Sequence, residues 1–226
     1  MRFSVAMTLV VAFSIASERA HAVIVAQYDF TGSSLNSSDT NLDSTASAFS
    51  TVGMTSVIEL TIGNPAPGIY ASAANIDSGP ISTPATKDYY SFTVTPIATS
   101  LDYTTLTMDV RAATTKTGNY DFSLQTSLNN FTTNIATFII VGGTSATTFQ
   151  NYSFDLSAFS SSAVAQEFRI VLRDDTSTAS AGLVFDNVTL NTVPEPTTAV
   201  LVLGTLAAGM LLCRRRSNPS SSDALS

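Results

Sequence analysis

The chain has few of the side chains on which most catalytic and metal sites depend. Its 226 residues include one His, one Cys and no Trp, and only 12% are charged, about half the usual share of roughly 25%. A single Cys excludes an intrachain disulfide. The 17 acidic residues outnumber the 10 basic ones, giving a net charge of −7. This acidic balance argues against nucleic acid or anionic lipid as the main partner.

The first 22 residues have the pattern of an export signal. Arg2 supplies a positive start, residues 5–15 are apolar, and Ala20 and Ala22 are the small residues that a signal peptidase accepts. Cleavage after Ala22 would start the mature chain at Val23. An uncleaved anchor helix is the alternative, but the apolar run is too short to cross roughly 30 Å of hydrocarbon.

The C-terminal region consists of three elements in a fixed order. Pro194, Glu195 and Pro196 come first, residues 197–213 follow without a charge, and Arg214, Arg215 and Arg216 come next. A helix over the uncharged run would be about 25 Å long, at the low edge of a membrane span. A buried core helix is disfavoured because the run is apolar on every face. We predict a transmembrane helix whose arginines stay in the cytoplasm, followed by a disordered cytoplasmic tail at 217–226.

This order of Pro-Glu-Pro, apolar helix and arginine cluster resembles the bacterial PEP-CTERM sorting signal. The resemblance covers residues 193–216. It implies recognition by an exosortase, a membrane processing enzyme, and delivery of the exported part to the cell surface or the extracellular matrix. Members of the family usually end within a few residues of the arginines, whereas this chain continues to Ser226. A generic single-pass anchor is the other interpretation.

Residues 23–192, between the two signals, are predicted to form one all-β domain. Nine segments alternate apolar with polar residues, as strands with one buried and one solvent-facing side do. They are 23–30, 57–62, 90–94, 103–110, 120–124, 135–141, 152–156, 168–172 and 183–190. No segment shows a helical apolar stripe, so we predict an antiparallel β-sandwich. The order of these features is similar to the jelly rolls of carbohydrate-binding modules and related exported domains.

The positions of His and Cys limit the chemistry of this domain. His21 leaves with the signal peptide and Cys213 lies in the predicted membrane helix. Nucleophiles that depend on these residues, and zinc or copper sites built on them, are therefore excluded. Glu59 and Glu167 leave a carboxylate-dependent glycoside hydrolase or lyase as an alternative. Both alternate with apolar strand residues, so we predict solvent-facing charges and no enzyme activity.

Two further sites follow from the domain's resemblance and its aromatic residues. The jelly-roll resemblance implies a structural calcium between the first and final strands, with Asp29 and Asp186 as ligands; the alternative is that Asp186 and Asn187 only kink the strand. Sugar binding needs flat rings beside polar groups. Tyr89 and Tyr90 are candidates, because neighbouring residues of a strand point to opposite faces and one ring would be exposed.

Three functions remain open at this level. The leading hypothesis is a non-enzymatic structural or adhesive protein of the cell surface or matrix. The first alternative is a carbohydrate-binding module that recognises exopolysaccharide, which predicts exposed aromatic rings on one sheet face. The second is the glycoside hydrolase or lyase, which predicts two carboxyl groups roughly 5–10 Å apart in one cleft. The domain itself has five basic residues against fourteen acidic ones, so nucleic acid is not among its predicted partners.

Overall fold

The computed structural model describes residues 22–54, 56–59, 64, 71–75, 80–97, 100–112, 118–142, 148–174 and 182–193. The predicted signal peptide up to residue 21, the sorting element at 194–216 and the tail at 217–226 lie outside this part of the chain. Residues Ala22–Val193 form a compact unit with its own hydrophobic core, so this segment is expected to fold on its own. In the described ranges, no helix is both long and apolar enough to pass through a bilayer.

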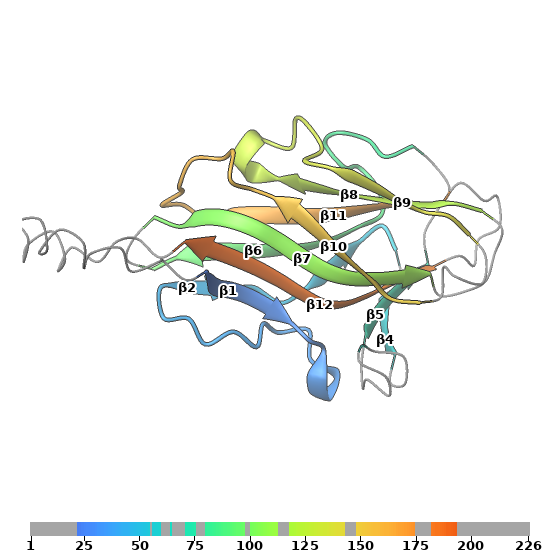
Figure 1. Ribbon diagram of the computed structural model, residues 1–226, viewed down its shortest axis with the longest axis horizontal. Coiled ribbons are helices and arrows are strands. Elements are labelled where there is room, and N and C mark those ends of the chain that lie inside the picture. Colours follow the sequence, from blue (N-terminus) through green and yellow to red (C-terminus); the bar gives the residue numbers. More distant parts are fainter. Residues whose placement is uncertain are drawn as a thin grey trace, which may run out of the picture. The chain divides into compact units, whose positions relative to one another are not determined.

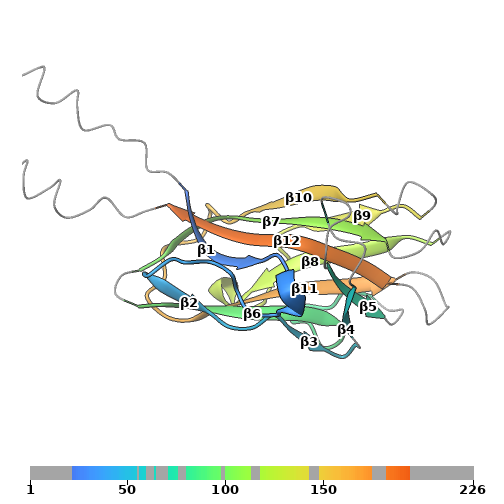
Figure 2. The same cartoon turned by 90° about the horizontal axis from the view of Figure 1, so that it is seen from below.

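Two antiparallel sheets make up the unit (Figures 1 and 2). The first sheet has the order β10-β7-β12-β5-β4, and β1 also pairs with β12. Its strands are β1 (Val23–Tyr28), β4 (Ser56–Glu59), β5 (Ala71–Asn75), β7 (Asp102–Ala112), β10 (Gln150–Asp155) and β12 (Gly182–Val193). The second sheet has the order β2-β6-β11-β8-β9, and β3 also pairs with β6. Its strands are β2 (Ser44–Ala46), β3 (Ser50–Val52), β6 (Tyr89–Pro96), β8 (Tyr120–Thr126), β9 (Thr137–Ile140) and β11 (Gln166–Asp174).

The predicted all-β sandwich is confirmed in its class, and each of the nine predicted segments overlaps a strand; residues 60–62 of the segment 57–62 lie outside the described residues. Strand β6 shows the cause: Tyr90, Phe92 and Val94 are at most 1% exposed, while the residues between them are half-buried. Two short 3₁₀ turns, η1 (Thr31–Ser33) and η2 (Ser127–Asn129), are the helical elements among the described residues. Figure 2 shows β7, β10 and β12 in one layer and β6 and β11 in the other.

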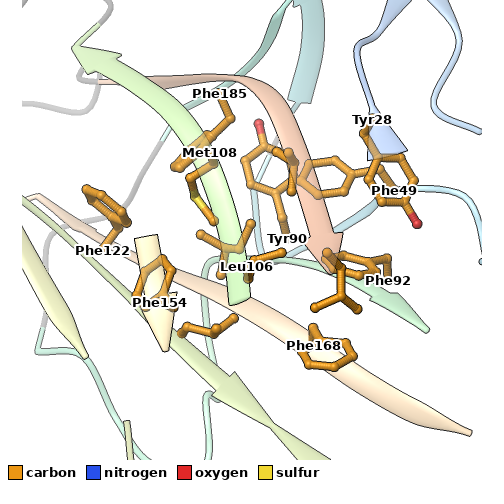
Figure 3. Packing of buried hydrophobic residues seen from close by; sticks show 14 of the residues in the cluster. Tyr28, Phe49, Tyr90, Phe92, Leu106, Met108, Phe122, Phe154, Phe168 and Phe185 are labelled. Atoms are coloured by element: carbon orange, nitrogen blue, oxygen red, sulfur yellow. The ribbon is translucent and has the colours of Figure 1, made fainter. Parts of the chain in front are cut away.

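The core between the sheets is dominated by aromatic rings (Figure 3). Phe49 stacks on Tyr90 with 4.8 Å between ring centroids, and Phe92 stacks on Phe168 at 5.4 Å. Tyr28 tilts against Phe92 at 5.1 Å, which ties the first strand of one sheet to the other sheet. Offset and edge contacts of this kind stabilise a core by about 0.5–1.5 kcal/mol each beyond their buried area.

Three strands, β2, β3 and β5, were not predicted from the sequence. Two of them, β2 and β3, lie in or beside the Ser- and Asn-rich segment that follows β1. Strands β2 and β3 are three residues each and consist mostly of small hydroxyl side chains, so they carry no apolar alternation. Strand β5 is rich in Ala, which has a low strand preference. The polar residues between β1 and β2 form local turns, such as Asn41 N–H donating to Asp39 Oδ1 at 3.0 Å.

Candidate functional site

The solvent-facing side of the second sheet carries a row of polar and aromatic side chains. Strand β11 pairs with β6 so that Arg169 lies opposite Ser91 and Glu167 lies opposite Thr93. Tyr89 lies two residues before Ser91 on the same face of β6. Residues directly opposite each other in an antiparallel pair share a face, and the alternation of β6 therefore places Tyr89, Ser91, Glu167 and Arg169 together.

The guanidinium of Arg169 packs against two aromatic rings on this face. Its Cζ lies 3.7 Å from the ring centroid of Phe131 and 5.0 Å from that of Tyr89. Nε donates to Glu167 Oε1 at 2.7 Å and Nη2 donates to Oε2 at 3.2 Å. The side chains of Arg169 and Glu167 are 17% and 30% exposed. We call this group of Tyr89, Ser91, Phe131, Glu167 and Arg169 the Arg169 patch.

Arg169 retains hydrogen-bonding capacity on its solvent side. Guanidinium groups have five N–H donors, and the two bonds to Glu167 use Nε and Nη2 only. Within the described residues Nη1 donates to no partner. The bonds to Glu167 also raise the pKa of Arg169 above its ordinary value, so the group stays charged. Within the described part of the chain, the patch therefore has N–H donors beyond those bound by Glu167, beside two aromatic rings, which is a combination that binds hydroxyl-rich ligands.

The position of Phe131 depends on a strained piece of backbone. Asn130 and Phe131 follow η2, and both have left-handed φ angles, 55° and 56°. This region is tolerated by Gly and by Asn but is unfavourable for a bulky residue such as Phe131. The turn is closed by Phe131 N–H donating to Thr126 O at 3.0 Å, and it carries the Phe131 ring onto Arg169. Backbone strain of this type is concentrated at binding and active sites.

One side of the same sheet face is covered by chain rather than open. Gln125 on β8 is fully buried although it points to the solvent side of the sheet opposite Arg169. Its side chain accepts from Ala85 N–H at 2.9 Å and donates to Ser82 O at 2.7 Å and Asn134 Oδ1 at 2.8 Å. The segment before β6 is thereby fixed over β8, and the Arg169 patch lies beside this cover.

A groove of about 410 Å³ lies at the end of the sandwich next to the patch. Its walls are Ser127, Leu128, Ala158, Phe159, Ser160, Ser161, Ser162 and Gln166. Ser127 Oγ donates to Gln166 Oε1 at 2.7 Å and accepts from Glu167 N–H at 2.8 Å. Ser127 therefore connects the groove with the backbone of Glu167, whose carboxylate binds Arg169. The groove is lined mainly by hydroxyl groups and has one half-buried ring, Phe159.

The predicted metal ligands lie on the other sheet, in a network of buried polar groups. Asp186 is 3% exposed and accepts from the backbone N–H groups of Asn64 at 2.6 Å and Asn187 at 2.8 Å. Its neighbour Asp109 is 8% exposed and accepts from three asparagine side chains, Asn64, Asn151 and Asn187, at 2.8–3.0 Å. Asn187 has a left-handed φ of 51°, and the pairing of β12 with β7 shifts there. Strand β12 is therefore kinked at Asp186 and Asn187, as the alternative to a calcium site predicts.

Burial governs the ionisation of Asp186. It raises the pKa of this carboxyl to about 6, against two backbone hydrogen bonds that lower it, and the negative charges of Asp109 and Asp29 raise it further. The carboxylate of Asp29 has hydrogen-bond partners of its own: it accepts from Thr31 N–H at 3.0 Å and from Ser38 Oγ at 3.1 Å. The described residues contain no group of three or more His, Cys, Asp or Glu placed to hold a metal. Asp29 and Asp186 by themselves do not supply the six to eight oxygen ligands that a calcium ion needs.

The two tyrosine candidates have different environments. Tyr90 is fully buried and packs edge-on against Phe185 at 5.4 Å, so it belongs to the core and cannot serve as a ligand platform. Tyr89 is half-buried on the solvent side, beside Arg169. Sequence reasoning missed Arg169 and Phe131. The nearest signal was the run from Glu167 to Arg169, because side chains two apart on a strand share a face.

The ion pair of Glu167 with Arg169 argues against the alternative of a glycoside hydrolase or lyase that uses Glu59 and Glu167. Both of its oxygens bind Arg169, which suits a fixed anion and not a group that exchanges a proton with substrate. Glu59 ends β4 in the first sheet, whereas Glu167 lies in the second. These two glutamates thus come from different sheets.

No protein-family model matches this sequence, and no curated protein matches it. Among solved structures, it is similar to the Clostridium thermocellum xylanase 10B CBM22-1–GH10 modules in complex with xylohexaose, at 15% identity and a TM-score of 0.43 over 77% of this chain and 29% of that one. It is also similar to the CBM22-1 xylan-binding domain of Paenibacillus barcinonensis Xyn10C, at 12% identity and a TM-score of 0.41 over 76% and 96%. A family 29 carbohydrate-binding module gives 12% identity and a TM-score of 0.37 over 76% and 89%. With TM-scores below 0.5, the function has to be argued from the chain's own residues.

Proposed function

We propose that the domain is a non-catalytic carbohydrate-binding module that holds a polysaccharide at the Arg169 patch. The observation that carries the proposal is the guanidinium of Arg169 packing against both Phe131 and Tyr89, with Nη1 bonded to no partner within the described residues. Sugars present C–H faces that pack on aromatic rings and hydroxyl groups that bind planar charged side chains. The patch supplies both, together with the hydroxyl of Ser91.

The charge of the patch favours sugars without acidic groups. Glu167 already neutralises Arg169 through a two-point ion pair, so an anionic ligand would have to compete with it. A neutral sugar hydroxyl instead accepts from Nη1 and donates to Glu167 without breaking the pair. The domain as a whole has fourteen acidic residues against five basic ones, which also disfavours acidic polysaccharides by long-range repulsion.

The location of this module is proposed from the two chain ends. An export signal with cleavage by signal peptidase after Ala22, and a PEP-CTERM element at Pro194–Pro196 with Arg214–Arg216, would place the domain outside the cell. An exosortase would then process it for display at the envelope surface or release into a matrix that contains exopolysaccharide. A chain truncated after Val193 should be secreted and lost from the envelope fraction. Equal retention of the truncated and full-length chains would contradict this location.

A glycan array with the segment Ala22–Val193 tests the binding function. We expect binding to neutral polysaccharides, and loss of binding in Phe131→Ala, which removes a ring without touching the core. Ile97→Ala is the matched control, because Ile97 is an apolar residue that is 60% exposed. It directly follows β6, at the end far from Tyr89 and from Ser91, the residue opposite Arg169. If the wild-type segment binds no glycan, the structural or adhesive hypothesis without a defined sugar site takes precedence.

A further inference from the structure

Strand β9 lies at one edge of the second sheet and exposes aliphatic side chains there. Its residues are Thr137, Phe138, Ile139 and Ile140, with Val141 directly after them. There is no charge and no Pro in this run. Ile139 and Val141 are 58% and 68% exposed. Exposed edge strands of high β-propensity pair readily with other strands, and most proteins shorten them or place charges on them.

Strands β2, β3 and β10, which also lie at sheet edges, carry such protection. Strands β2 and β3 at the opposite side of the same sheet have three residues each. Edge strand β10 of the first sheet ends in Asp155, which is exposed and whose pKa is lowered by hydrogen bonds from Ser157. Short length and a charge are two of the ways in which natural sheets prevent edge pairing. Strand β9 has four residues and is therefore nearly as short as β2 and β3, but it carries no charge.

The hydrogen-bond phase of β9 shows which of its groups face outward. Leu124 N–H on β8 donates to Ala136 O at 3.3 Å, and Phe122 then lies opposite Phe138 and Tyr120 opposite Ile140. Because bonding residues alternate along an antiparallel strand, the even-numbered residues of β9 bond to β8. The N–H and C=O groups of Thr137, Ile139 and Val141 point away from the sheet, and they have no partner within the described part of the chain.

These outward groups match those of a second copy of the same strand. A two-fold axis at Ile139 would pair it with the same residue of a second chain, and would pair Thr137 with Val141 in both directions. All three side chains are exposed on one face, so this register covers the two exposed aliphatic residues with β-branched partners, a favourable cross-strand combination. The pairing joins neutral segments in a chain whose net charge is −7, where contacts between most other surfaces would bring like charges together.

We propose that the domain self-associates through β9, forming an antiparallel dimer in which the second sheets of two copies become one continuous sheet. The contact is short compared with the roughly 1,200–2,000 Å² of a stable complex, so the dimer is weak. It leaves the Arg169 patch uninvolved, since β9 lies beyond β8 in the strand order β6-β11-β8-β9. Each dimer would therefore present two patches, and their combined binding to one polysaccharide would exceed that of a single domain.

Sedimentation velocity on the segment Ala22–Val193 at up to about 0.5 mM, a range chosen for weak contacts of this size, tests the dimer. We expect a concentration-dependent dimer for the wild type and at least about a tenfold weaker association for Ile139→Lys, because like charges would then face each other. Val164→Lys is the matched control: Val164 is 66% exposed and lies between β10 and β11. It should associate as the wild type does.

Two further measurements distinguish this register from a general loss of solubility or folding. An equal mixture of Ile139→Lys and Ile139→Glu should recover the dimer, because residue 139 faces its own counterpart. The segment has no Cys, so Ile139→Cys should form an interchain disulfide on mild oxidation faster than Val164→Cys, the paired Cα atoms being about 5.5 Å apart. A wild type that stays monomeric throughout, an Ile139→Lys variant that dimerises normally, or a mixture that stays monomeric would each overturn the proposal.

Discussion

Asp109 on β7 lies directly opposite Asp186 on β12, and both carboxyl groups are buried. Two buried acids in adjacent positions would repel each other if both were charged. Three asparagine side chains donate to Asp109, while Asp186 receives two backbone N–H groups. The pair is thus stabilised by amide donors, and burial keeps the pKa of Asp186 raised, at about 6.

The raised pKa of Asp186 makes its contribution to stability depend on pH. The protonated form is favoured in the folded state, so the stabilisation is complete below the ordinary value of 3.8 and is lost as the pH rises through about 6. We expect the unfolding free energy of the wild type, relative to Asp186→Asn, to rise by about 1–2 kcal/mol between pH 7 and pH 4. Urea denaturation of both proteins at the two pH values measures this. A difference that is constant with pH would show that Asp186 is an ordinary carboxylate.

Calcium gives a separate test of the same region. Asp29 and Asp186 are predicted as calcium ligands by the jelly-roll resemblance, whereas the described residues contain no group of three or more acidic, His or Cys side chains placed to hold an ion. We therefore expect less than about 1 °C difference in Tm between 5 mM CaCl₂ and 5 mM EDTA, since a ligand that binds only the folded state raises Tm measurably. A higher Tm in calcium that disappears in Asp186→Asn would restore the predicted site.

The hydroxyl of Tyr103 is buried in the core and lacks a hydrogen-bond partner among the described residues. Its ring is 1% exposed and packs edge-on against Phe168 at 5.3 Å. Burial without a partner also raises the pKa of this phenol. Tyr103→Phe keeps the ring and removes the unpaired group, so we expect stabilisation by about 1 kcal/mol, measured by chemical denaturation. A loss of stability would mean that the hydroxyl is paired in solution.

A substitution at Phe131 is expected to weaken glycan binding without lowering the stability of the domain. Its left-handed φ of 56° is unfavourable for any residue with a Cβ, and its ring lies on Arg169 at the surface. Phe131→Gly should leave the unfolding free energy within about 0.5 kcal/mol of the wild type or raise it, while glycan binding falls at least tenfold. Denaturation and a glycan titration on the same sample measure both. Binding that survives the substitution would remove Phe131 from the site.

The sequence was sufficient for the fold class because the long strands have a regular apolar alternation. Tyr90, Phe92 and Val94 on β6 are an example, and burial of these residues follows the pattern. Strands β2 and β3 could not be predicted, since three-residue runs of Ser and Thr pair through backbone bonds to β6 and bury little apolar surface. Their existence depends on the partner strand β6, whose paired residues lie 37 to 52 positions further along the chain.

The candidate site could be predicted only in part from the sequence, because its residues are brought together by strand order and by an unusual turn. Tyr89 is on the solvent face of its strand, as alternation allows, but alternation alone does not say which of Tyr89 and Tyr90 points outward. Arg169 and Phe131 come together because the turn after η2 reverses the chain with two left-handed residues. Asn130 is of a residue type that adopts the left-handed region readily, but no residue preference indicates that Phe131 follows it there. The pairing of Asp109 with Asp186 likewise arises from strand order, which a period of two does not report.

The most direct test of the account is an isothermal titration of a neutral oligosaccharide found on the array into Ala22–Val193 and into Arg169→Lys. Lysine keeps the charge but loses the planar group that packs between the rings and binds Glu167 at two points. Arg111→Lys is the matched control, because Arg111 also lies over a ring, Phe149 at 5.3 Å, but on the other sheet. We predict at least tenfold weaker binding for Arg169→Lys with the control unchanged. Equal affinity of Arg169→Lys and the wild type would contradict the assignment of the binding site to this face.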